Sequence, residues 1–385
     1  MNRQVILLIL SVFAINACKD PFSPEVEAQY KNLLVVEGFI NVGGETTIQI
    51  SRSADLQDWQ SLIPEKEAQV IIEGEKGTVL SGTSDINGKC VLSTASLNLS
   101  ERYRLKIVSK GKTYQTAYLE NKKSPEIDSL NFRVEDKGFK IYVNTHDKAG
   151  ETRYYNWYFT ETWEIRSAFP SAFEYKNGRV IERDPNINIQ YCWAQNRSSK
   201  IILASSERLS EDRLSMVPIH HVLGNSAKVA YMYSILVTQY GLTSEAYHYL
   251  ENIKKNTEQI GSIFDAQPSE LKGNVVCVSN PQEMVLGWIS AGTTTQKRLF
   301  ISYKDKPANG GTDWMFYQPC EPFTTSKDSL LYYLAGRNLI ISESYGTKPL
   351  PDGSTVGIFL YSMARDECID CRLRGSNVKP GYWPN

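Results

Sequence analysis

Two short stretches show the pattern that decides the fold: Thr46-Thr47-Ile48-Gln49-Ile50-Ser51 and Tyr103-Arg104-Leu105-Lys106-Ile107. In both, alternate residues are suited to a buried face and the others to solvent, which is the period of a strand with one face in a core. Similar runs recur from residue 33 to residue 121, and turn residues such as Gly43-Gly44 and Asn87-Gly88 separate them. About seven short strands without an intervening helix indicate a β-sandwich over residues 33–121.

A polar break ending in proline, Asn121 to Pro125, predicts a boundary, with a second domain over residues 126–385. Residues 154–165 and 228–240 carry strand patterns in this second part. The period then changes at Thr243-Ser244-Glu245, where a capping residue and an acidic first turn precede a helix over about 243–257. We therefore predict a mainly β protein, with a larger β-rich domain and one prominent helix after the sandwich.

The first residues resemble a bacterial lipoprotein leader. Arg3 precedes an apolar run from Val5 to Ala14, which is of signal-peptide length and short for a membrane span. Ile15-Asn16-Ala17-Cys18 then matches a lipobox, so we expect a signal peptide over residues 1–17, acylation of Cys18, and a tether over residues 18–32. An ordinary secretory signal with an incidental cysteine is the alternative. Several acyl chains would anchor the protein stably in a membrane.

The charge balance argues against nucleic acid as a partner. The chain has 42 basic and 43 acidic residues among 385, so it has no net field that would attract phosphates. Its 22 tyrosines, 7 tryptophans and 13 phenylalanines favour β-structure.

Six cysteines follow Cys18, and an exported protein can oxidise them. An even count allows three disulfides and fifteen pairings, between which the sequence does not choose. We expect disulfides among Cys192, Cys277, Cys320, Cys368 and Cys371, with Cys90 as the unpaired candidate. A zinc site or free thiols are the alternatives, and Cys368-Ile369-Asp370-Cys371 has the spacing of a redox motif but lacks the βαβ context of one.

Catalytic and metal motifs are not evident in the sequence. There are four histidines, and His220-His221 on a strand would point to opposite faces, which disfavours one shared metal. We find no zinc-protease, serine-hydrolase, phosphate-binding or dinucleotide motif. The sequence therefore predicts no cofactor, no metal and no enzymatic activity. A catalytic carboxylate pair that only the fold brings together would not be recognisable in the sequence.

Two sets of residues are candidates for a ligand or partner surface. Phe264, Asp265 and Gln267 lie in an irregular stretch between the helix and the next strand, where loops often carry function. Trp157, Trp163 and Trp193 are aromatic residues that would suit a ligand face. The alternatives are a rigid capping loop and ordinary core packing, respectively.

Several segments in order resemble a large family of Bacteroidota outer-membrane lipoproteins of unknown function, the DUF4249 family. They are residues 34–38, 47–53, 239–247, 255–258, 261–268, 273–275 and 368–384. The resemblance implies an N-terminal immunoglobulin- or transthyretin-like sandwich and association with TonB-dependent transporters. It supplies no catalytic residues.

Together these observations predict a non-catalytic lipoprotein of the outer membrane, and Lys19-Asp20 gives a partial signal for exposure at the cell surface. Its expected role is the accessory or ligand-capturing partner of a TonB-dependent transporter. The alternatives are a structural or adhesive envelope protein without a small ligand, and a hydrolase of surface glycan or peptide.

Overall fold

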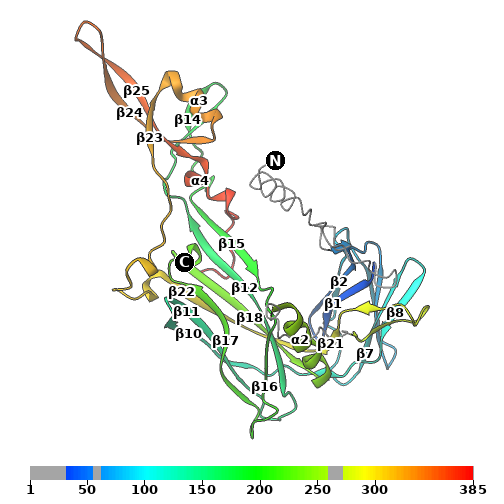
Figure 1. The fold of residues 1–385 in the computed structure, drawn as a ribbon. Coiled ribbons are helices and arrows are strands. Elements are labelled where there is room, and N and C mark those ends of the chain that lie inside the picture. The colour runs from blue at the N-terminus through cyan, green and yellow to red at the C-terminus, as the bar shows by residue number, and fades with distance from the viewer. Residues whose placement is uncertain (1–31, 55–61, 259–271, 385) are drawn as a thin grey trace, which may run out of the picture.

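The computed structural model describes residues 32–54, 62–258 and 272–384. It is mainly β, which confirms the predicted fold class. Figure 1 shows two β-sandwiches side by side, the helix α2 (Ser244–Glu258) between them, and a C-terminal extension that projects away from both. We call the two sandwiches with α2 the body.

The first sandwich consists of two facing sheets. One has the order β3-β2-β1-β21-β9, with β6 also on β2 and β20 also on β1; the other has the order β19-β8-β7-β4-β5. The strands of the first sheet are β1 (Leu34–Asn41), β2 (Glu45–Ser53), β3 (Leu62–Pro64), β6 (Lys89–Ser93), β9 (Asn121–Lys122), β20 (Val285–Leu286) and β21 (Ile289–Gly292). Those of the second are β4 (Gln69–Gly74), β5 (Val79–Thr83), β7 (Tyr103–Ser109), β8 (Lys112–Thr116) and β19 (Val275–Cys277).

The alternation in the sequence sets the core of this sandwich. Tyr103, Leu105 and Ile107 of β7 are buried, while Arg104 and Lys106 between them point outward. They pack with inward residues of both sheets in one apolar cluster. The period-two pattern therefore predicted both the strands and their faces.

The first sandwich takes three strands from far along the chain. β20 and β21 both pair in parallel with β1, with Gly38 opposite Ile289, and β19 pairs with β8. These strands fall within the predicted second domain, residues 126–385, so the sandwich extends beyond residues 33–121. A local alternation pattern predicts that a strand forms but not which strand it pairs with, because tertiary packing decides the neighbour.

The second sandwich packs a three-stranded sheet, β10-β11-β17, against a five-stranded one, β15-β12-β18-β22 with β16 on β12. The strands are β10 (Ile127–Glu135), β11 (Gly138–His146), β12 (Tyr154–Arg166), β15 (Tyr191–Arg197), β16 (Ile202–Ser205), β17 (Arg213–Leu223), β18 (Met232–Leu242) and β22 (Thr294–Ser302). The short 3₁₀ turn η2 (Ala227–Val229) lies between β17 and β18, and η3 (Tyr303–Asp305) and η4 (Gly311–Trp314) follow β22.

The helix α2 begins where the sequence predicts. Thr243 Oγ1 accepts the backbone N–H of Ala246 at 3.3 Å, which caps the first turn. Ala246 and Tyr249 are buried, and the Tyr249 hydroxyl accepts the N–H of Gly287 from the first sandwich at 3.1 Å. The helix thereby links the two sandwiches.

The extension beyond the body is built on a long hairpin. β24 (Asn338–Pro349) and β25 (Thr355–Arg365) form it, and β23 (Phe323–Ser326) adds a third strand at its base. The remaining elements surround this base: β13 (Phe173–Lys176), β14 (Arg179–Glu182), η5 (Lys327–Ser329), α3 (Leu330–Ala335), α4 (Asp366–Ile369) and η6 (Cys371–Leu373).

Candidate functional site

The three tryptophans predicted for a ligand face do not form one. Trp157 is fully buried in the second sandwich, where its indole N–H donates to Gln239 at 2.9 Å. Trp163 packs partly against the same core. Trp193 lies opposite Glu164 in the β12–β15 register, so strand alternation directs it to the other side of the sheet, where it meets Trp383. The prediction of a shared aromatic surface is therefore wrong.

The other predicted surface residues, Phe264, Asp265 and Gln267, lie outside the described residues, as does the lipidation candidate Cys18. Their expected roles stay predictions.

Four of the cysteines form two disulfides. Cys320 pairs with Cys368, and Cys192 pairs with Cys371, with sulfur–sulfur distances of 2.06 and 1.96 Å. The two cysteines of the redox-like spacing, Cys368 and Cys371, therefore bind different partners. Cys90 is free and buried, and so is Cys277, which corrects its inclusion among the disulfide candidates. Cys277 faces the apolar core of the first sandwich, whereas the paired cysteines gather at the base of the hairpin.

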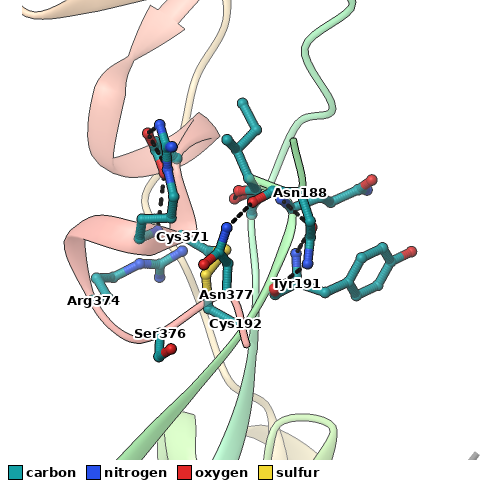
Figure 2. Close-up of a disulfide and its surroundings, with 12 residues drawn as sticks. Asn188, Tyr191, Cys192, Cys371, Arg374, Ser376 and Asn377 are labelled. Atoms are coloured by element: carbon teal, nitrogen blue, oxygen red, sulfur yellow. Dashed lines mark hydrogen bonds and ion pairs between the residues drawn. A yellow bond between two sulfur atoms is a disulfide. The ribbon is translucent and has the colours of Figure 1, made fainter. Parts of the chain in front are cut away.

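These disulfides fix the extension to the body. The Cys320–Cys368 bond closes a loop that contains β23, α3, β24 and β25, and we call this loop, residues 320–368, the arm. The Cys192–Cys371 bond joins the segment just after the arm to β15 of the second sandwich. Figure 2 shows this second bond beneath the C-terminal tail, where Asn377 donates to the Asn188 carbonyl at 2.9 Å.

The arm exposes apolar side chains at its distal end. β23 pairs with β25 only as far as Leu360, so the hairpin beyond it is two-stranded. Tyr345 and Phe359 lie opposite each other there, with ring centroids 4.2 Å apart, and they are 76% and 43% exposed. Leu350 and Val356 are also exposed. An isolated two-stranded ribbon with unpaired edges and exposed apolar residues is a surface suited to protein contact.

A buried ion cluster occupies the second sandwich. Glu161 of β12 accepts the Tyr233 hydroxyl at 2.9 Å, and its Oε1 lies 3.0 Å from His220 Nε2. Lys228 Nζ contacts the other oxygen at 2.5 Å and lies 5.1 Å from the centre of the Trp163 ring. Burial raises the pKa of Glu161, but the hydrogen bonds from His220 and Lys228 outweigh it and lower the pKa to about 2. Every partner in the cluster is paired, so its geometry is that of a structural element.

A hollow of about 220 Å³ opens where the two sandwiches meet α2, and we call it the hollow. Its lining includes residues from three segments. They are the stretch that precedes the second sandwich in the sequence, with Tyr118 and Lys122; the first turn of α2, with Glu245; and the region of β21, with Trp288 and Ser290. The start of α2 and the segment around Asn274 could each be recognised in the sequence. The hollow itself could not be predicted, because only tertiary packing brings these segments together.

The lining of the hollow is held in place by contacts behind it. The Asn274 side chain accepts the N–H of Ile289 at 2.9 Å and donates to the carbonyl of the same residue at 2.7 Å. Tyr249 of α2 packs on Trp288, with ring centroids 5.1 Å apart. The hydrogen bonds that Glu245 accepts from its own backbone N–H and from Thr243 lower its pKa, so its carboxylate is ionised at neutral pH.

Within the described ranges, no three His, Cys, Asp or Glu side chains gather closely enough to hold a metal ion. In the same part of the chain, none of the helices is long and apolar enough to span a membrane.

The family model for a domain of unknown function, DUF4249, matches residues 19–298 of the chain. The chain belongs to the DUF4249 family. The match covers both sandwiches as far as β22 and includes every residue named in the hollow. The arm lies after the matched residues.

No curated protein matches this DUF4249 chain. Among solved structures, a two-domain fibronectin type III segment from chicken tenascin is 8% identical, over 55% of this chain and 93% of its own, with a TM-score of 0.18. A tetra-tandem repeat from the extending region of a large adhesion protein is 9% identical, over 88% of this chain and 66% of its own, with a TM-score of 0.18. Likenesses at these TM-scores add no argument about fold or function.

Proposed function

We propose that this DUF4249 protein is a non-catalytic lipoprotein of the Bacteroidota outer membrane, anchored through Cys18, and that it serves a TonB-dependent transporter as its accessory partner. The arm is the contact in this proposal. The lipobox-like segment from Ile15 to Cys18 and the family membership support the anchor and the compartment.

The exposed distal end of the arm carries the proposal of a protein partner. Tyr345, Phe359, Leu350 and Val356 are large apolar residues, and each is at least 40% exposed. Aromatic residues that lose solvent in a contact supply much of the binding energy of protein interfaces. The two disulfides hold the base of the arm, so little ordering of the arm is needed before it binds.

The test is a mild-detergent pull-down of the tagged, lipidated protein from its native membrane, read by mass spectrometry. We expect one TonB-dependent transporter in near-stoichiometric amount. It should disappear from the eluate of the double variant Tyr345→Ser/Phe359→Ser. The matched control is Tyr303→Ser, because Tyr303 is an exposed tyrosine, at 54%, outside the arm.

Three results would overturn the proposal in different ways. An eluate without a transporter from the unmodified protein would reject the partnership. Other envelope proteins in its place, with altered envelope integrity in a deletion strain, would favour a structural or adhesive role. Turnover of an envelope glycan or peptide by the purified protein would establish a hydrolase.

A further inference from the structure

The hollow between the sandwiches is separate from the arm, and nothing in the partner contact proposed above uses it. It collects side chains from three places in the sequence: Glu120 and Lys122, Glu245, and Trp288 with Ser290. The packing of Tyr249 on Trp288 and the two hydrogen bonds of Asn274 hold this lining before any ligand arrives. A preformed lining lowers the cost of ordering on binding.

The size of the hollow limits its occupant to a small molecule. Pockets for drug-sized ligands are roughly 300–1,000 Å³, and the hollow is about 220 Å³. One ring with its substituents fits such a volume, whereas an extended chain of rings would have to continue into solvent.

The charges of the lining disfavour an anion and offer a cation only one carboxylate without a basic partner in the lining. Lys122 and Glu120 pair at 2.7 Å, and Glu245 adds a second carboxylate. An anionic ligand would meet two carboxylates, and a cationic ligand would meet the Lys122 ammonium. The lining therefore offers both donors and acceptors without a strong field of one sign.

We propose that the hollow binds a single saccharide ring, as a free monosaccharide or as the end of a glycan. A sugar is neutral, its hydroxyl groups both donate and accept, and its C–H face packs on aromatic rings. Glu245, Lys122 and Ser290 supply the polar partners, and Trp288 and Tyr118 supply the aromatic surface.

The test titrates the full chain in detergent with monosaccharides by isothermal calorimetry and saturation-transfer NMR. The probes are glucose, galactose, mannose and N-acetylglucosamine, with arginine and inorganic phosphate as charged comparisons. We expect at least one sugar to bind and neither ion to bind. Glu245→Gln should weaken the binding about tenfold, equivalent to about 1.4 kcal/mol, because glutamine keeps an acceptor but loses the charge that strengthens the hydrogen bond.

The matched control is Glu251→Gln on the same helix, where the carboxylate pairs with Lys255 outside the hollow and should leave the affinity unchanged. Trp288→Leu keeps an apolar side chain but removes the ring, and should abolish the NMR saturation transfer. Thermal unfolding of each variant verifies that it is folded. The inference fails if no sugar binds at millimolar concentration, if an ion binds instead, or if Glu245→Gln and Glu251→Gln behave alike. The sugar-binding inference and the transporter proposal are tested independently. A transporter in the pull-down would not support sugar binding, and a pull-down without a transporter would not contradict it.

Discussion

The body and the arm are both made of β-strands, but different forces hold them. In the body, strands such as β4 and β7 alternate buried and solvent-facing residues, and two apolar clusters fill the sandwiches. In the arm, a small cluster at the base and the Cys320–Cys368 bond support a ribbon whose distal aromatic residues lie in solvent. This difference is the reason why we propose the body as a scaffold and the arm as the part that contacts another protein.

Truncation of one aromatic side chain in each region should have the most different effects on stability. Trp157→Ala in the body should lower the free energy of unfolding by about 3–5 kcal/mol, because it leaves a cavity and an unpaired Gln239 Oε1. Tyr345→Ala in the arm, where the ring is 76% exposed, should change it by about 0.5 kcal/mol or less. Urea unfolding measures both, and similar losses would contradict the division.

The buried ion cluster should be the next most sensitive point of the body. Glu161→Gln leaves Lys228 without its carboxylate and should cost about 3 kcal/mol of unfolding free energy. Glu211→Gln is the control, because Glu211 pairs with Arg213 in solvent with its side chain 76% exposed, and it should cost about 0.5 kcal/mol or less. A loss below about 1 kcal/mol for Glu161→Gln would show that Lys228 is readily solvated.

Removing the bond at the base of the arm should loosen the arm alone. Cys320→Ser/Cys368→Ser reopens the loop and should remove about 2–4 kcal/mol of local stability. Limited proteolysis with mass spectrometry should then show cleavage within residues 320–368 while the sandwiches stay intact. Equal cleavage in the body would mean that the two regions unfold together.

Acid should weaken the body through two carboxylates, one in each sandwich. Glu65 is held by Arg52, Ser109 and Lys110, and like Glu161 it has a pKa lowered from 4.5 to about 2. A lowered pKa in the folded state stabilises the fold fully above about pH 4.5, and this contribution is lost as the pH falls to about 2. Thermal unfolding should therefore occur at lower temperatures across this window, with a smaller decrease in Glu161→Gln. If the unfolding temperature of that variant decreased as much as that of the unmodified protein, Glu161 would not be a source of the acid sensitivity.

The sequence predicted the parts of the fold that depend on local pattern. Alternation identified strands such as β7, and Thr243 with Glu245 marked the start of α2. It did not reveal the parallel pairing of β1 with β21, because the two strands are far apart in the chain and each has the same kind of pattern as its alternatives.

The candidate site was less predictable for the same reason. Trp157 and Tyr345 are both aromatic residues in strands, and only the packing shows that the first is buried and the second exposed. His220 and Glu161 meet across the sandwich although 59 positions separate them. The pairing of four cysteines also depends on where the tertiary fold places them, since the sequence does not distinguish the fifteen pairings of six cysteines.

The most direct test of the arm as the partner contact is site-specific photo-crosslinking in the native membrane. A photoreactive residue would replace Tyr345 in the arm or, in a matched protein, Tyr303 outside it, since both tyrosines are exposed. We expect one dominant crosslinked protein, a TonB-dependent transporter, from position 345 and none from position 303. A crosslink from position 303 alone would place the contact on the body and would show that the arm is not the partner contact.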